Sequence, residues 1–456
     1  MQGLSDSIAA HVAGLASQDV PPPAIHAAKL ALLDAVGVML GASGLAEEAR
    51  PFVALARAGG SGPCAILGTG LTAPPEAAAL ANGAFAHALD FEDAFDRAPG
   101  HPNASLVPAL IALAQSEGPI SGLDFLAALA IGGDLSCRMG LALRRRMEAG
   151  HWYPPPILAA YGAAAGAARL IGLDPRGIRD ALSLTLCQAT MPGEIKHSET
   201  SEIRAVREAF PARAAVTSAL LARGGVRGFE EPLEGKSGFY ALYAGGQYDP
   251  ADLLDGLGNK FLIEELTFKA WPCCRGTHAA VELALRLRAE HGFASSEIER
   301  IEIGVDEVQQ MLVEPAERKR MPATSADAKF SIPFTCAVAL ARGRVGLDDF
   351  GPATLADPEV LRLCAVTEHR IASDPCWVRG TGGSLTVVLY DGRRFAATLA
   401  QARGAPGNPL SEDEIRAKFV ACAGYASVPL SEDAAQELAD LILEMDRLQD
   451  AGAIFN

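Results

Sequence analysis

The chain contains 456 residues, of which 49% are hydrophobic and 21% are charged, and its formal net charge is −16. This composition is typical of a globular protein with two or three domains. The negative charge, without a basic stripe, argues against nucleic acids and anionic membranes as partners, although a few basic side chains in a cleft can still bind a small anionic substrate.

Most of the chain before residue 268 shows the apolar spacing of amphipathic helices, and cores of alanine and leucine favour closely packed helices. The first helix is predicted to have Ser5 or Asp6 as its N-cap. Helices are predicted over residues 5–18, from the prolines at 21–23 to about 39, over 75–88, 106–115, 124–143, 157–173 and 176–190, and up to about 222.

The pattern changes after residue 278, where helices and strands are mixed. Residues 298–305 alternate as a strand does, and residues 384–400 predict a β-hairpin with a type I′ turn at Asp391-Gly392. Helices are predicted over 278–290 and within 411–448. The chain is therefore predicted to be mainly α. A large helical domain (1–268 and 403–456) carries an inserted, smaller α+β lid domain (269–402).

One group of reactive side chains lies at this change of pattern, in the segment FKAWPCCRGTH (268–278). It holds Lys269, Cys273, Cys274, Arg275 and His278 within eleven positions. Ligand sites favour clefts between domains, so we expect this segment to line one. The alternative is a structural turn with buried cysteines and a surface arginine.

A second group follows the helix over 75–88. Asp90, Glu92 and Asp93 lie at its C-terminal end, where the helix dipole disfavours negative charge, and His101 opens the next helix. Placement against the dipole indicates a functional cluster. The alternative is a solvated acidic face with a plain helix-entry histidine.

A third group consists of an aromatic residue and a basic loop. Tyr153 precedes three prolines that begin a helix, which can present its hydroxyl near a helix N-terminus. The loop from 191 to 215 contributes Lys196, Arg204 and Arg207. The alternatives are a packing tyrosine and solvated basic side chains.

The sequence predicts neither a metal nor a cofactor. Nucleotide-binding and metalloprotease motifs are absent, and adjacent cysteines such as Cys273 and Cys274 rarely ligate one tetrahedral ion. A Cys274 nucleophile with His278 as its base stays open. We expect no signal peptide and no apolar run of transmembrane length, and therefore a cytoplasmic protein.

Five stretches together resemble the MmgE/PrpD family. They are HALDFEDAF with GHPNAS (87–105), the proline-led helix at 151–170, VREAFPARAA (206–215), FKAWPCCRGTHAAVE (268–282) and PATSADAKFSIPF (322–334). Members include 2-methylcitrate dehydratase, cis-aconitate decarboxylase and iminodisuccinate epimerase. The resemblance implies a helical domain with a lid, no metal or organic cofactor, a homodimer, and proton movement next to a carboxylate.

The resemblance also implies roles for individual residues. Asp90 and His101 match the first motif, and Lys269 and His278 match the start and end of the lid segment. Four positions depart from the decarboxylase pattern: Ala94 stands for a threonine, Tyr153 for a histidine, Arg207 for a lysine and Cys274 for a histidine. These departures put a dehydratase or decarboxylase in doubt.

Our leading hypothesis from the sequence is a cofactor-independent epimerase that moves a proton α to a carboxylate of a small polycarboxylate. Tyr153 and Lys269 would be bases on opposite faces of the carbon, and Asp90 would orient His101. The expected anion clamp and substrate contacts are Arg207, Arg275, His278, Lys196 and Cys274. The alternatives are a lyase of the same family that uses His101 and Lys269, and a carboxylate-binding protein without activity.

Overall fold

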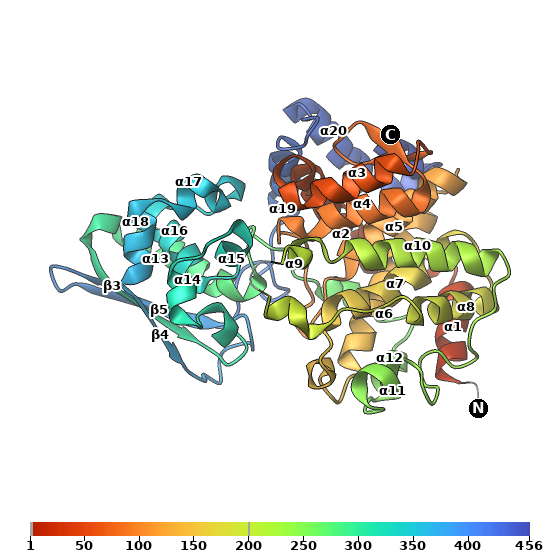
Figure 1. Ribbon diagram of the computed structural model, residues 1–456, viewed down its shortest axis with the longest axis horizontal. Coiled ribbons are helices and arrows are strands. Elements are labelled where there is room, and N and C mark those ends of the chain that lie inside the picture. Colours follow the sequence, from red (N-terminus) through yellow and green to blue (C-terminus); the bar gives the residue numbers. More distant parts are fainter. Residues whose placement is uncertain (1–2, 199–200) are drawn as a thin grey trace. The chain divides into compact units, whose positions relative to one another are not determined.

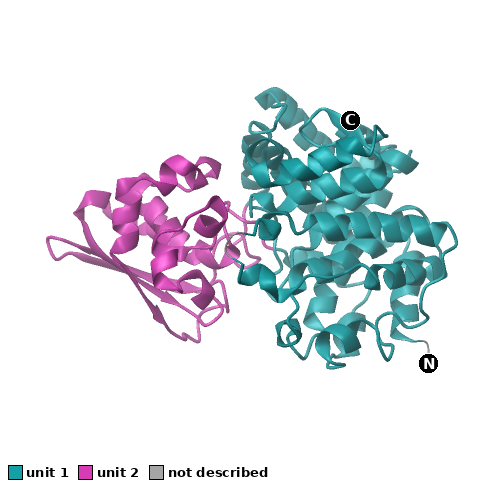
Figure 2. Ribbon diagram, viewed as in Figure 1, with its two compact units in different colours: residues 1–266, 411–456 teal, residues 267–410 magenta. Residues whose placement is uncertain are grey.

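A computed structural model describes residues 3–198 and 201–456 of the chain. These residues form two compact units (Figure 2). Unit 1 comprises Met1–Leu266 and Ser411–Asn456, and unit 2 comprises Thr267–Leu410. The sequence placed the corresponding divisions at 268/269 and 402/403. The C-terminal segment thus returns to the helical unit.

Unit 1 is built of helices and one short β-hairpin (Figure 1). The helices are α1 (Leu4–Gly14), α2 (Pro22–Leu45), α3 (Arg50–Ala58), α4 (Pro75–Ala88), α5 (Pro102–Glu117), α6 (Gly122–Leu141), α7 (Pro154–Leu170), α8 (Pro175–Leu186), α9 (Ile203–Val206), α10 (Ala209–Arg223), α11 (Phe239–Ala244), α12 (Pro250–Leu254), α19 (Glu412–Ala423) and α20 (Glu432–Leu443). The hairpin pairs β1 (Cys64–Ile66) with β2 (Leu71–Ala73). The predicted mainly α fold is confirmed.

Helix α7 lies at the centre of unit 1 and packs against α5, α6 and α10. Small residues make this packing possible. A Cβ atom added at Gly162 would lie 2.3 Å from the carbonyl oxygen of Gly132 on α6, so these two backbones approach too closely for any side chain. On α6, Arg138 forms the buried ion pair with Asp134 that the i, i+4 spacing suggests, at 2.6 Å.

The expected N-cap of the first helix is wrong, and so is the expectation that no apolar run reaches transmembrane length. The N-cap of α1 is Gly3 rather than Ser5 or Asp6, because Ser5 is already helical and donates its hydroxyl proton to Glu234. Helix α2 has 24 residues and is long and apolar enough to cross a membrane. However, 83% of its most apolar window is buried inside the protein, as in a core helix.

Unit 2 contains a four-stranded sheet covered by helices. The strands are β3 (Ile298–Val305), β4 (Thr367–Ile371), β5 (Gly383–Leu389) and β6 (Arg394–Leu399), in the order β4-β3-β5-β6; the helices are α13 (His278–His291), α14 (Ala316–Arg320), α15 (Ser325–Lys329), α16 (Ile332–Arg342), α17 (Pro352–Leu355) and α18 (Pro358–Ala365). Burial alternates along β5, so one face of this strand is buried and the other is partly exposed.

The predicted strand over 298–305 and the predicted hairpin over 384–400 are confirmed, but the turn is not type I′, because Asp391 does not have the positive φ that this turn requires. Strand β3 covers the predicted residues, and β5 pairs antiparallel with β6 through the turn that contains Asp391-Gly392. Strand β4 was not predicted. It pairs parallel with β3 and has only one buried residue in five, so it lacks the alternation that identifies a strand.

Candidate functional site

The acidic segment after α4 begins with an unusual backbone conformation. Asp90 has a φ of 52°, in the left-handed region, and its amide donates to the carbonyl of His87 at 2.8 Å. Aspartate tolerates this region better than most residues, and the turn ends the helix. The chain therefore reverses direction at Asp90 and returns Glu92 toward the last turn of α4.

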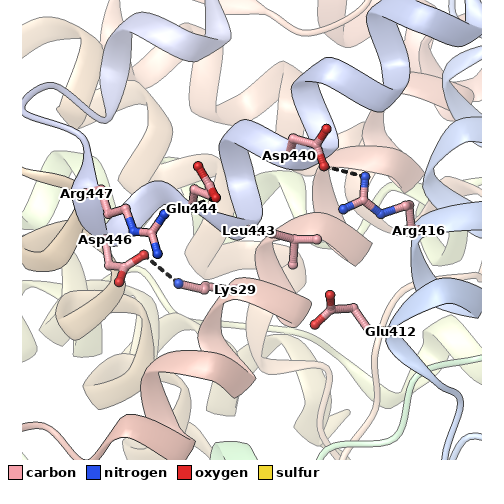
Figure 3. Close-up of a pocket in the computed structure, with 8 residues that line it drawn as sticks. All are labelled: Lys29, Glu412, Arg416, Asp440, Leu443, Glu444, Asp446 and Arg447. Carbon is pink, nitrogen blue, oxygen red and sulfur yellow. Dashed lines mark hydrogen bonds and ion pairs between the residues drawn. The ribbon is translucent and has the colours of Figure 1, made fainter.

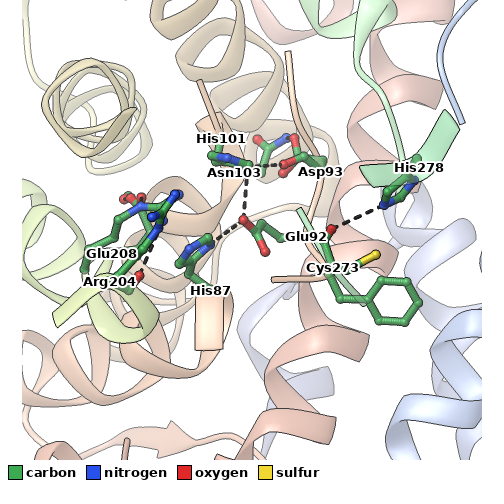
Figure 4. Close-up of polar contacts among 12 residues, drawn as sticks. His87, Glu92, Asp93, His101, Asn103, Arg204, Glu208, Cys273 and His278 are labelled. Atoms are coloured by element: carbon green, nitrogen blue, oxygen red, sulfur yellow. Dashed lines mark hydrogen bonds and ion pairs between the residues drawn. The ribbon is translucent and has the colours of Figure 1, made fainter. Parts of the chain in front are cut away.

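Glu92 contacts two histidines with one oxygen (Figure 4). Its Oε1 accepts a hydrogen bond from Nδ1 of His87 and lies 3.0 Å from Nδ1 of His101. The carboxylate in contact with His101 is therefore Glu92, whereas the sequence analysis assigned this orienting role to Asp90. The same Nδ1 of His101 lies 2.8 Å from the carbonyl oxygen of Asp93.

His87 is neutral at this position. Burial, together with the nearby positive charge of Arg207, lowers the pKa of His87 to about 3, although the Glu92 carboxylate opposes the change. A neutral imidazole carries one proton. His87 therefore donates to Glu92 without cancelling its charge.

The first turn of α5 holds the other side of this cluster. The amide group of Asn103 donates to Asp93 at 2.7 Å, and the hydroxyl of Ser105 donates to Glu208 at 2.5 Å. Burial, with the negative charge of Asp34, raises the pKa of Asp93 well above its usual range, and burial also raises the pKa of Glu208. The cluster is thus a buried polar network in which these two carboxyl groups bind protons more strongly than they would in water.

Arg207 is buried within this network. Its Nε donates to Glu208 at 3.1 Å, and its Nη1 donates to the carbonyl of Arg204 at 3.3 Å. Burial acts to lower the pKa of Arg207, but the surrounding groups, Tyr153 and Glu208 first, raise it above its usual value. The guanidinium is therefore held as a cation among carboxylates.

Tyr153 lies beside Arg207, and its ring is approached by two cations. Both Cζ of Arg207 and Nζ of Lys196 lie 5.3 Å from the ring centroid. The amide of Tyr153 donates to the carbonyl of Met191 at 2.8 Å, which fixes the residue at the N-terminus of α7. Lys196 also lies 3.4 Å from Glu148. Unit 1 thus brings Tyr153, Lys196 and Arg207 together, and their role at a substrate site stays a prediction.

Unit 2 carries the remaining predicted residues. Arg275 donates to the carbonyls of Arg403 and Ala402 at 2.8 and 2.9 Å, and its Nη1 lies 3.4 Å from Nδ1 of His278. The Nε2 atom of His278 lies 3.3 Å from the carbonyl oxygen of Cys273 (Figure 4). Both ring nitrogens of His278 thus face these partners, an arrangement that does not favour His278 as a base for the Cys274 thiol.

Lys269 is buried in unit 2, in a segment whose backbone is held by a loop. The amide of Phe268 donates to the carbonyl of Gly404 at 3.1 Å. Gly404 has a φ of 96°, and a Cβ atom there would lie 1.9 Å from the carbonyl oxygen of Phe268. Only glycine permits this close contact, which holds the backbone next to Lys269 in place.

Replacing Gly404 with alanine is expected to destabilise unit 2 by about 2–4 kcal/mol, because the left-handed φ and the backbone clash act together. The matched control is Gly392→Ala, where φ is 86° but nothing lies within 4 Å of the added atom. It should cost only about 1–2 kcal/mol. Chemical denaturation of both variants measures the difference. Equal losses of stability would show that the clash with the carbonyl of Phe268 does not add to the cost of the left-handed φ.

One cluster of possible metal ligands lies among the residues that the structure describes. His87, Asp90 and Glu92 place potential ligand atoms within 4.8 Å of one another. Glu92 Oε1 already contacts two histidines, and the Arg207 cation acts on the same group, a setting that disfavours a second cation. The expectation that no metal is needed stays a prediction.

The pockets of unit 1 differ in character. One of about 280 Å³ is lined by charged side chains already paired as Lys29–Asp446 and Arg416–Asp440 (Figure 3). Another, of about 560 Å³, lies along the loop after α8 and has an apolar lining that includes Met191 and Phe210. Neither presents a free cluster of cations for a polycarboxylate among the described residues.

Comparison with known proteins gives the same family for both parts of the chain. The MmgE/PrpD N-terminal domain matches residues 6–251, and the MmgE/PrpD C-terminal domain matches residues 271–445. The chain is 28% identical to the cis-aconitate decarboxylase-like protein oryM of Aspergillus oryzae, over 97% of this chain and 94% of that protein. It is 26% identical to a cis-aconitate decarboxylase of Aspergillus terreus, over 98% and 94%, and 27% identical to that of Mus musculus, over 84% and 78%. The chain therefore belongs to the MmgE/PrpD family.

Proposed function

We propose that the protein is a cofactor-independent lyase that decarboxylates a small unsaturated polycarboxylate related to cis-aconitate. The observation that carries the proposal is that relatives named as cis-aconitate decarboxylases align over nearly the whole chain. These relatives favour the lyase alternative of the sequence analysis over its leading epimerase hypothesis. The buried histidine–carboxylate cluster of unit 1 supports proton transfer as the chemistry.

In this reaction the bond between the departing carboxylate and its neighbouring carbon breaks. Its electron pair forms a new double bond, the original double bond shifts, and the far alkene carbon takes a proton while carbon dioxide leaves. We assign the proton transfer to Nε2 of His101, which takes a proton from solvent to form the imidazolium and gives it to the alkene carbon, because its Nδ1 is held by Glu92 and by the Asp93 carbonyl. Lys269, matched to the lid motif, is assigned to binding and charge stabilisation of the reacting carboxylates.

An epimerase is the second candidate function, because one observation favours it. Two cations lie 5.3 Å from the ring centroid of Tyr153, in the position where the decarboxylase pattern has histidine. Cations near a phenol favour its action as a base. In this scheme Tyr153 and Lys269 would act on opposite faces of an α-carbon, as the sequence analysis described.

Proton NMR in heavy water distinguishes the two functions. The full-length protein is incubated separately with cis-aconitate, 2-methylcitrate, citrate and single-enantiomer iminodisuccinate, with His101→Gln as the control. For the lyase we expect a new vinyl pattern from cis-aconitate, one solvent deuterium in the product, and release of carbon dioxide. Deuterium at an α-carbon with inversion and no carbon dioxide would instead establish the epimerase.

A further inference from the structure

We propose that Glu92, held in place by His87, is a positioning residue that acts together with the carbonyl of Asp93 to keep the proton of His101 on Nδ1, which leaves Nε2 to exchange a proton with the substrate. The inference rests on the proposed function only for the role given to His101. The arrangement of the three side chains is independent of the substrate.

The proton on Nδ1 of His101 follows from its two neighbours. Nδ1 donates a hydrogen bond to the carbonyl oxygen of Asp93 at 2.8 Å, and Oε1 of Glu92 lies 3.0 Å from the same nitrogen. A carbonyl oxygen cannot donate and a carboxylate accepts, so both neighbours favour the proton on this nitrogen. In the neutral ring this leaves the lone pair on Nε2, and the His101 side chain remains 16% exposed while Glu92 is fully buried.

His87 explains why Glu92 stays in this position. Its Nδ1 donates to the same Oε1 atom that faces His101, and the two rings lie 5.5 Å apart at 55°. Because His87 is neutral, it orients the carboxylate but does not neutralise it. A carboxylate in this position stabilises the imidazolium whenever Nε2 takes a proton.

Three separate elements supply the parts of this arrangement. His87 belongs to the last turn of α4, Glu92 to the loop that turns at Asp90, and His101 is the N-cap residue of α5. A carboxylate that only stabilised the fold would need one donor. Two histidines on one oxygen, the outer one partly exposed, fit a device that sets the tautomer of the outer ring.

The test combines histidine NMR with steady-state kinetics on Glu92→Gln. The full-length protein, labelled with ¹⁵N-histidine, gives the tautomer of each of its nine histidines, and His101→Gln assigns the signal of His101. In wild type we expect the proton on Nδ1. In Glu92→Gln the amide can donate to the same nitrogen in competition with the hydrogen bond to the Asp93 carbonyl, so a measurable fraction of the Nε2–H tautomer should appear, with kcat lowered about 10- to 100-fold and KM changed less than about threefold.

His87 provides a matched pair of variants. His87→Asn keeps an N–H donor near the position of Nδ1 and should retain the tautomer and most of the activity. His87→Leu removes the donor and should mix the tautomers of His101, with a loss of kcat. This pair also tests the proposal if Glu92→Gln fails to fold.

The outcomes separate this inference from the proposed function. If His101 keeps its proton on Nδ1 in a folded Glu92→Gln or His87→Leu protein, the inference is wrong, whatever happens to kcat. If the tautomer changes as expected but wild type does not decarboxylate cis-aconitate, the positioning role stands and the proposed function fails. The NMR measurement needs no substrate, so the two results are independent.

Discussion

Replacing Lys418 with methionine is expected to lower the free energy of unfolding of unit 1 by about 3–5 kcal/mol. Lys418 on α19 forms a buried ion pair with Asp34 on α2 at 2.6 Å, and its Nζ also donates to the carbonyl of Phe91 at 2.6 Å. Removing the cation leaves the Asp34 charge buried and uncompensated. The same change frees the carbonyl of Phe91, next to Glu92. Chemical denaturation of the full-length protein measures the loss.

Two comparisons show whether burial is the cause. Arg416 lies on the same helix and pairs with Asp440 at 2.6 Å, but the Asp440 side chain is 63% exposed. Arg416→Met should therefore cost no more than about 1 kcal/mol. The double variant Asp34→Leu with Lys418→Met removes both charges and should recover most of the stability. A loss for Lys418→Met no larger than that for Arg416→Met would contradict the argument.

Elements with a clear period could be predicted from the sequence, and elements defined by distant contacts could not. Helix α4 and strand β3 have the predicted bounds, because a proline stands in the first turn of α4 and the sequence of β3 alternates between apolar and polar residues. Helix α2 continues past the predicted end at about residue 39, through Gly41 and Gly44. These glycines let α2 approach the segment around α19, since a Cβ atom at Gly44 would lie 2.0 Å from the carbonyl oxygen of Tyr425. A local pattern cannot distinguish such a glycine from a helix stop.

The candidate site shows a similar division. The sequence drew attention to His101 and to the acidic residues after α4, but it chose Asp90 as the partner of His101. Which carboxylate faces the histidine is decided by the left-handed turn at Asp90, and residue spacing does not reveal this turn. The network partner Glu208 was also missed, because a carboxylate beside an arginine in sequence resembles an ordinary surface pair.

Lys269→Met is expected to lower kcat/KM for cis-aconitate about 10³-fold, which corresponds to about 4 kcal/mol of transition-state stabilisation. Lys269 is buried, and methionine keeps much of its length and volume without its amine, so a loss of stability has to be measured beside the loss of activity. The control is Lys260→Met. The Lys260 side chain is 56% exposed, and its Nζ is paired loosely with Glu265, at 3.8 Å. Thermal unfolding of both variants confirms that the fold is intact.

Tyr153→Phe completes the test, because the two candidate functions give it opposite results. A lyase that uses His101 and Lys269 needs no phenol hydroxyl, so carbon dioxide release should stay within about threefold of wild type. A two-base epimerase needs the hydroxyl as one of its bases, and inversion should then fall by a factor on the order of 10² to 10⁴. Because the ring is kept, the approach of Lys196 and Arg207 to it is preserved, and any loss belongs to the hydroxyl. If Lys269→Met and Tyr153→Phe both left turnover unchanged, neither assignment of residues would hold.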